Sequence, residues 1–211
     1  MKTTQTSLYS EIEKTINRLE FKTISEERKL ILEKLSNYIQ SKTRKNEEVK
    51  IQFICTHNSR RSHLSQVWAQ AIAHYFGMSN VTCYSGGTEA TALFPKIIET
   101  LRASGFKIKM TSKGKNPVYE IKYSENDEGV TGFSKKIEDD SNPKKQFAAV
   151  MTCSEADNTC PNVEGAEKRI SLTYDDPKAF DQSPLQTKKY NERSLQIAKE
   201  LFYVFSKANS K

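Results

Sequence analysis

The sequence predicts an α/β fold: a three-layer sandwich around a central, mostly parallel four-stranded sheet, with an N-terminal helical extension and an inserted β-hairpin. Segments that indicate strands occur at 51–54, 81–85, 147–153 and 167–172, of which 51–54 and 147–153 are the most apolar. Segments with apolar residues at helical spacing separate or follow them. Strands that alternate with helices form parallel sheets covered on both faces. The 211 residues suffice for one domain with an appendage.

Residues 1–48 are predicted to form the helical extension. Ser10 with Glu13 matches a capping box, and a second helix is expected to start near Thr23, with Glu26 three residues on. The apolar positions at helical spacing are Ile12, Ile16 and Leu19, and then Leu32, Leu35, Tyr38 and Ile39. Such half-apolar helices are not stable alone, so we expect them to pack on the main body, residues 49–211, or on a second copy in a homodimer.

The main body is expected to begin with the strand at 51–54, which leads into a long amphipathic helix ending near Gly77. The periodic apolar positions of that helix are Leu64, Val67, Trp68, Ala71, Ile72, Tyr75 and Phe76. After the strand at 81–85, a further helix has Pro95 in its first turn and Gly105 as its stop.

The second half of the chain continues the pattern. Residues 117–137 alternate apolar and polar side chains around the turn sequence NDEG, which predicts a hairpin inserted at about 115–140. Buried strands are expected at 147–153 and 167–172, and the last helix over 187–207.

Charge and composition limit the classes of function. The net charge is +7, which favours anionic ligands. The basic residues are scattered and no zinc-finger or RNA-binding motif occurs, so no nucleic-acid partner is expected. No apolar stretch approaches the ~18 residues of a membrane helix, and the N-terminus lacks a signal-peptide core. We therefore expect a cytoplasmic protein with no membrane partner and with reduced cysteines.

The strongest chemical signal is the loop CTHNSRRS between the first strand and its helix. A loop that closes onto a helix N-terminus directs backbone N–H groups at a site that favours negative charge. That site stabilises the thiolate of Cys55, which is the nucleophilic form. Arg61 can bind two oxygens of a tetrahedral oxyanion, Ser62 can hydrogen-bond the sulfur, and Asn58 suits a left-handed conformation. The expected oxyanion-binding residues are Thr56, His57, Asn58, Ser59, Arg60, Arg61 and Ser62.

A second signal is Asp175-Asp176-Pro177 in a late turn. Release of an oxyanion from a thiol-bound intermediate needs an acid for the leaving oxygen and a base for water, and Asp176 could supply both. Proline after Asp176 favours an extended, outward-facing backbone.

A third signal is the pair Cys153 and Cys160 in MTCSEADNTCP. Cys153 closes a strand whose carboxyl end is expected beside that of the first strand, so three thiols within reach of one another suggest disulfide exchange. Two inert thiols are the alternative. Their spacing is not the usual short zinc hook, and His57, His63 and His74 form no evident partner pair, so neither a metal nor a cofactor is expected.

The loop CTHNSRRS, SGGTEA at 85–90, MTCSEADNTCP and DDP occur in the order found in thioredoxin-coupled arsenate reductases, which the chain resembles over about 49–211. Those enzymes share the fold of low-molecular-weight protein tyrosine phosphatases. The loop and DDP belong to both groups, whereas the cysteine pair is specific to the reductases. The family usually has glycine where His57 stands.

The resemblance implies a mechanism. Cys55 would attack arsenate held by Arg61 and the loop amides, while Asp176 protonates the leaving oxygen. Cys153 would then attack Cys55 to release arsenite, and Cys160 would attack Cys153. A thioredoxin-like reductant would reduce the Cys153–Cys160 disulfide, carried on a loop that swings outward.

Two alternatives stay open. The chain could be a phosphatase that uses Cys55, Arg61 and Asp176 on phosphotyrosine or a small phosphate ester, with the other two thiols protecting Cys55. It could also be a non-catalytic oxyanion-binding or redox-sensing protein recruited through residues 1–48.

Overall fold

The computed structural model describes residues 8–210. At its centre is a four-stranded parallel sheet, as predicted, and its strands lie in the order β2-β1-β6-β7. The strands are β1 (Val49–Cys55), β2 (Val81–Gly87), β6 (Phe147–Met151) and β7 (Ala166–Ser171). Cys55 pairs in register with Gly87, and Ile54 with Met151. The carboxyl ends of β1, β2 and β6 therefore meet at one edge of the sheet.

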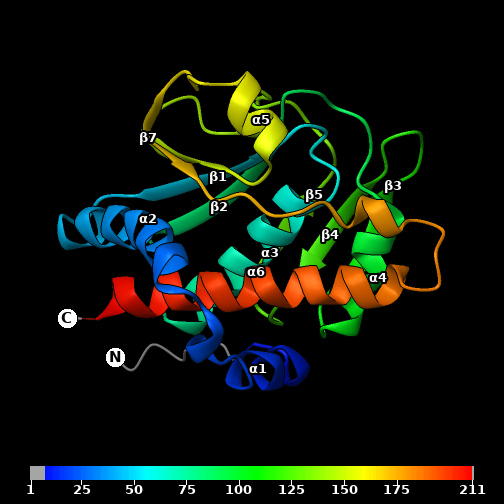
Figure 1. Cartoon of the computed structure of the whole chain (residues 1–211), viewed down its shortest axis with the longest axis horizontal. Coiled ribbons are helices and arrows are strands. Elements are labelled where there is room, and N and C mark those ends of the chain that lie inside the picture. Colours follow the sequence, from blue (N-terminus) through cyan, green and yellow to red (C-terminus); the bar gives the residue numbers. More distant parts are fainter. Residues whose placement is uncertain (1–7, 211) are drawn as a thin grey trace.

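Helices cover one face of this sheet in a thick layer (Figure 1). They are α1 (Ser10–Asn17), α2 (Glu26–Arg44), α3 (Arg61–Tyr75), α4 (Pro95–Ala103) and α6 (Gln186–Asn209), with short 3-10 turns η1 (Phe21–Thr23) and η2 (Pro177–Phe180). Trp68 of α3 is fully buried, lies edge-on to Phe106 and donates its indole N–H to Ser194 of α6 at 2.9 Å. Among residues 8–210, no helix has the length and apolarity needed to cross a membrane.

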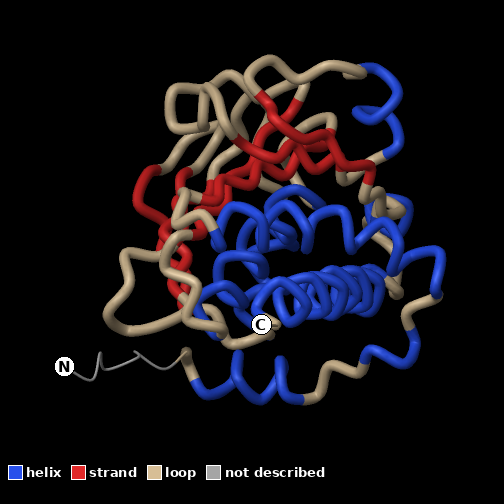
Figure 2. Tube along the Cα trace, turned by 90° about the vertical axis from the view of Figure 1, so that its left-hand side faces the viewer, coloured by secondary structure: helices blue, strands red, loops and turns tan. Residues whose placement is uncertain are grey.

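The opposite face of the sheet is covered by one short helix, α5 (Ser154–Thr159), and by loops (Figure 2). Phe147 and Met151 of β6 pack there against Ala156 of α5, with Ile137 and Val163 at the edge. The predicted three layers are confirmed, and the third layer consists mostly of loop.

Both predicted capping boxes in the N-terminal extension are wrong. Tyr9 occupies the N-cap position of α1 and no side chain caps that helix, because Ser10 is already helical. Thr23 lies inside the turn η1, and Ser25 caps α2 instead. Its extended backbone lets its hydroxyl accept the backbone N–H of Arg28 at 3.3 Å.

The apolar face of the extension packs on the main body of the same chain. Its fully buried residues, which share one hydrophobic core with β1 and α6, are Ile12, Ile16, Leu32, Leu35 and Ile39. A continuous core crosses the expected boundary near residue 48, so the division of the chain into 1–48 and 49–211 stays a prediction.

The predicted hairpin is present, but the prediction left out a third strand that pairs with it. β4 (Val118–Lys122) and β5 (Val130–Gly132) pair antiparallel, and β3 (Lys107–Ser112) pairs with the free edge of β4 to make a three-stranded sheet. The side chains of β3 are largely exposed. Residues 106–110, FKIKM, do alternate apolar and charged side chains, so the prediction overlooked a short strand pattern directly after the expected helix stop at Gly105.

Candidate active site

The Cys55 loop lies where the sequence predicted it, between the end of β1 and the start of α3. Cys55 is the last residue of β1 and is 4% exposed, while Arg61 is the first residue of α3. The Sγ atom of Cys55 is 3.1 Å from Oγ of Ser62, so the predicted contact between these side chains is confirmed. A hydroxyl that donates to the sulfur stabilises it as a thiolate.

Asn58 braces the loop from inside. It adopts the predicted left-handed conformation, with φ 43°, and is fully buried. Its Nδ2 atom donates to Ser62 Oγ at 2.9 Å and lies 3.3 Å from Nδ1 of His63, while its Oδ1 accepts the backbone N–H of Lys135 at 2.9 Å. Burial lowers the pKa of His63 to about 3, so the ring is neutral and Nδ1 can accept. Its Nε2 lies 3.1 Å from the carbonyl oxygen of Phe133.

The insertion supports the loop in a way that the sequence did not indicate. The hydroxyl of Ser134 donates to the carbonyl of His57 and accepts the N–H of Thr91, both at 2.8 Å. Gly87 allows the close approach of β2, because a Cβ there would lie 2.7 Å from the backbone nitrogen of Asn58. Strand and insertion together thus fix the backbone of the oxyanion loop.

Arg61 and Asp176 meet across the site. An ion pair of 2.5 Å joins Nη2 of Arg61 to Oδ2 of Asp176, and Nη1 of Arg61 donates to the carbonyl of Tyr174 at 2.9 Å. The Nε of Arg61 is buried with no hydrogen-bond partner among residues 8–210, which leaves an N–H for an oxyanion oxygen. Asp176 also caps η2 through the N–H of Lys178, at 3.0 Å.

Several of the expected oxyanion-binding side chains are engaged by other residues. Ser59 donates to the carbonyl of Ala92 at 2.6 Å, and Arg60 and His57 also have partners outside the loop. Arg60 donates to Tyr190 and Asp181, both at 2.7 Å, and stacks over the ring of Phe94. The ring of His57 lies at the rim, with Nδ1 3.2 Å from a carboxylate oxygen of Glu89. These two residues still line a cavity of about 140 Å³ in front of Cys55. Its other lining residues are Cys55, Thr56, Ser59, Arg61, Glu155, Asp176 and Lys178.

The structure brings Cys153, but not Cys160, into contact with the Cys55 loop. Cys153 is fully buried at the start of α5, and its Sγ is 3.5 Å from Oγ1 of Thr56. That hydroxyl donates to Oε2 of Glu155 at 2.9 Å. Cys160 is partly exposed at the far end of α5. The segment between the two cysteines is helical and is not the loop we expected. Cys153 caps this helix, since its sulfur accepts the N–H of Ala156.

The remaining cysteine and the metal question are simpler. Burial raises the pKa of Cys83, which keeps this thiol protonated and inert. All four cysteines are free thiols. Within the part of the chain that the structure describes, no cluster of His, Cys, Asp and Glu could hold a metal ion.

Lys135 provides a stability prediction. It is 4% exposed, lies over the ring of Phe133, and burial lowers its pKa from 10.5 to about 8. Because the folded chain binds this proton more weakly than the unfolded chain does, the charge destabilises the fold below about pH 8. That destabilisation disappears as the pH rises from about 8 to about 10.5.

We therefore expect Lys135→Met to raise the free energy of unfolding at pH 7 by about 1–3 kcal/mol. The gain over the wild type should shrink toward zero near pH 10.5 when urea denaturation is repeated there. The exposed Lys113→Met is the matched control and should show no such pH dependence. A gain that is the same at both pH values would show that Lys135 carries no buried charge.

Residues 50–157, just over half of the chain, match the model of the low molecular weight phosphotyrosine protein phosphatase family. The chain belongs to this family. The matched segment contains the whole loop from Cys55 to Ser62 and also Cys153, while Cys160 and Asp176 follow it.

Relatives and solved structures agree with the family. The chain is 31% identical to arsenate reductase 2 of Staphylococcus haemolyticus over 136 residues, which cover 64% of this chain and 84% of that protein. It is 28% identical to an arsenate reductase of Staphylococcus aureus, again over 136 residues that cover 64% of this chain and 84% of that protein. A low molecular weight protein tyrosine phosphatase of T. tengcongensis superposes with a TM-score of 0.51 at 14% identity, covering 76% of this chain and 99% of that one. An arsenate reductase in a phosphate-binding state superposes with a TM-score of 0.50 at 19% identity, covering 75% of this chain and 98% of that one.

The family match places the N-terminal extension outside the shared segment, since only residues from 50 onward are matched. In this chain α2 packs against α6 and β7, and α1 packs against α6. Arg28, Glu155, Ser134 and Lys135 are the residues near the site that sequence reasoning missed. Arg28, Ser134 and Lys135 belong to no short motif and reach the site only through long-range packing, whereas Glu155 lies inside the motif MTCSEADNTCP, where only the two cysteines were considered.

Proposed function

We propose that this chain reduces arsenate to arsenite with three thiols, those of Cys55, Cys153 and Cys160. The observation that carries the proposal is the position of Cys153, whose sulfur lies 3.5 Å from a side chain of the Cys55 loop. A phosphatase mechanism needs only the first thiol. The similarity to staphylococcal proteins named arsenate reductases supports the same activity.

The first step uses the loop and Asp176. The Cys55 thiolate attacks arsenic, and a proton from Asp176 converts the departing oxygen to water. Arg61 and the loop amides hold the remaining oxygens. The oxyanion has to take over the guanidinium that Asp176 occupies in this structure, and this frees the carboxyl group to act at the leaving oxygen.

The second step moves electrons to arsenic. The thiolate of Cys153 attacks Sγ of Cys55, the S–As bond breaks, and its electron pair reduces As(V) to As(III). Arsenite leaves, and a Cys55–Cys153 disulfide remains. Cys160 then attacks Cys153, which regenerates the Cys55 thiolate and forms the Cys153–Cys160 disulfide. A dithiol of the thioredoxin type would reduce that bond.

The last exchange requires α5 to unwind. The six helical residues between the two cysteines separate them by about 10 Å along the axis, whereas a disulfide brings Cα atoms to about 5.5 Å. Arg169 of β7 ties the segment down by donating to the carbonyls of Asp157, at 2.6 Å, and Cys160, at 3.2 Å. A helix of six residues has little stability of its own, so these contacts and Cys153 hold it.

A phosphatase activity is the second candidate, because the family is one of phosphotyrosine phosphatases and the Cys55, Arg61 and Asp176 set also suits phosphate-ester hydrolysis. Phosphate and arsenate are nearly isosteric tetrahedral anions. We therefore expect some hydrolysis of aryl phosphates even if arsenate is the physiological substrate.

The site residues, the compartment and the oligomeric state complete the proposal. A relay of free thiols fits the reducing cytoplasm. The homodimer expected from the half-apolar extension stays a prediction for light scattering, although the apolar residues on which it was based are buried within one chain.

Disulfide mapping tests the proposal. The reduced chain is incubated with arsenate, its free thiols are alkylated, and its peptides are analysed by mass spectrometry. We expect Cys153–Cys160 in the wild type and Cys55–Cys153 in Cys160→Ser. Cys83 should be alkylated after unfolding in both. Three free relay thiols together with rapid aryl phosphate hydrolysis would instead identify a phosphatase.

A further inference from the structure

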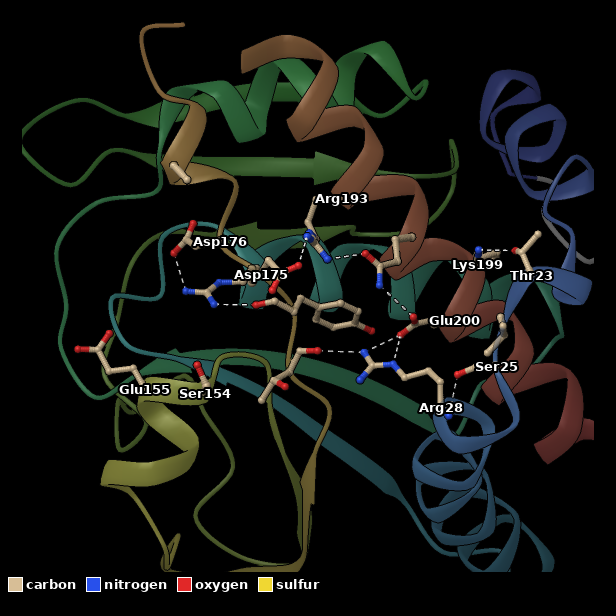
Figure 3. Close-up of a pocket in the computed structure, with 16 residues that line it drawn as sticks. Thr23, Ser25, Arg28, Ser154, Glu155, Asp175, Asp176, Arg193, Lys199 and Glu200 are labelled. Atoms are coloured by element: carbon tan, nitrogen blue, oxygen red, sulfur yellow. Dashed lines mark hydrogen bonds and ion pairs between the residues drawn. The ribbon is translucent and has the colours of Figure 1, made fainter. Parts of the chain in front are cut away.

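A wide cleft lies beside the small cavity at Cys55 and extends to the N-terminal extension (Figure 3). Its volume is about 990 Å³. Arg61 and Asp176 line one end, and residues 23–25 with Arg28 line the other. The wall between them is the loop 173–176, which carries Asp176. A segment outside the family match therefore lies close to the loop of the catalytic acid.

Arg28 of α2 contacts this loop directly. Its Nη2 atom donates to the carbonyl of Thr173 at 3.1 Å, and its guanidinium lies 4.9 Å from the centre of the Tyr174 ring. The same guanidinium forms an ion pair with Glu200 of α6, in which Nε and Nη2 donate to Oε2 of Glu200 at 3.0 Å and 2.8 Å. The Glu200 side chain is only 4% exposed, so the pair is shielded from solvent and fixes where Arg28 lies.

The contacts continue around the loop to its other side. The free oxygen of Glu200 accepts from Gln196 at 3.2 Å, Gln196 accepts from Arg193, and Arg193 donates to Asp175 at 3.1 Å. Arg61 holds the next two points, the carbonyl of Tyr174 and the carboxylate of Asp176. Every residue from 173 to 176 is thus held by an arginine.

Backbone contacts alone do not fix this loop. The N–H of Tyr174 donates to Thr152 at 3.1 Å, which is its last bond to the sheet edge. Beyond that point Asp175 and Asp176 depend on side chains until η2 begins. Once an oxyanion takes over Arg61, the arginines at the base of the loop are what remains to keep Asp176 above the site.

We propose that Arg28 is a positioning residue for Asp176, so that the N-terminal extension is a working part of the active site. The proposal rests on the acid role of Asp176 proposed above. It assigns to α2 a function in the reaction that packing alone would not require. Loss of Arg28 should allow the loop to move and should slow the steps that need a proton donor, with substrate binding by the oxyanion loop retained.

The variant must avoid a buried unpaired carboxylate, because removing Arg28 alone would leave Glu200 uncompensated. Arg28→Met combined with Glu200→Gln removes both charges. Lys34→Met is the matched control, since Lys34 is exposed on the same helix. Full-length wild type, both variants and Asp176→Asn are compared with p-nitrophenyl phosphate, a good leaving group, and phenyl phosphate, a poor one.

We expect the double variant to lower kcat for phenyl phosphate by about tenfold or more, and kcat for p-nitrophenyl phosphate by less than about threefold, with KM unchanged. Asp176→Asn should show the same dependence on the leaving group, and Lys34→Met should show none. Equal losses on both esters would overturn a positioning role, because a general loss of structure does not distinguish leaving groups.

Hydrogen exchange gives a readout that is independent of activity. The amides of residues 173–176 should exchange at least about fivefold faster in the double variant than in the wild type or in Lys34→Met. Unchanged exchange would overturn the proposal. If the wild type turned over neither ester nor arsenate, the proposed function would fail, and exchange would still decide whether Arg28 orders the loop.

Discussion

Cys55→Ser is expected to abolish arsenate reduction and aryl phosphate hydrolysis together, each by at least about 10⁴-fold. Both reactions begin with attack by the same sulfur. A serine hydroxyl at this position has a far higher pKa than a thiol, so the helix N-terminus cannot make it an alkoxide at neutral pH. Initial rates with arsenate plus a dithiol reductant, and with p-nitrophenyl phosphate, measure the two losses.

The fold should survive this substitution. Serine differs from cysteine only in having oxygen in place of sulfur, and its hydroxyl can keep the contact with Ser62. Circular dichroism and a thermal melt check this point. Cys83→Ala is the control thiol variant, because Cys83 is buried away from the loop, and it should keep both activities. If either activity persisted in Cys55→Ser, the shared mechanism would be wrong.

Cys153→Ser and Cys160→Ser are expected to separate the two activities. Each should end multiple turnover of arsenate, while p-nitrophenyl phosphate hydrolysis stays within about twofold of the wild type, because ester hydrolysis uses water in place of the second thiol. Cys160→Ser should release one arsenite per chain and stop at Cys55–Cys153. Cys153→Ser should release none, since no thiol can attack the Cys55 adduct.

Counting the arsenite released per chain with a limiting amount of enzyme distinguishes these outcomes. Glu164→Gln is a suitable control, since this exposed residue follows the relay segment and belongs to none of the steps. Continued cycling in both cysteine variants would rule out the relay. Equal loss of ester hydrolysis would instead show that the substitutions disturb the Cys55 loop, which Cys153 contacts through Thr56.

Much of the fold could be predicted because its signals are local. The buried strand β6 is a continuous apolar run, β1 is rich in apolar residues, and α3 and α6 have apolar residues at helical spacing. The errors arose where the sequence pattern is weak. The two capping boxes depended on residue identity without backbone conformation, and the alternation that marks β3, an exposed edge strand, covers only the five residues 106–110.

The sequence by itself determined the oxyanion loop, because Cys55, Asn58, Arg61 and Ser62 lie within eight residues between a strand and a helix. It also placed Cys153 beside that loop, since parallel strands bring their carboxyl ends together. Only the tertiary structure decided what supports the site. Lys135 bonds Asn58 across 77 positions, and Arg28 bonds Thr173 across 145. Contacts between such distant residues follow from packing of whole elements, and no periodicity or spacing in the chain encodes them.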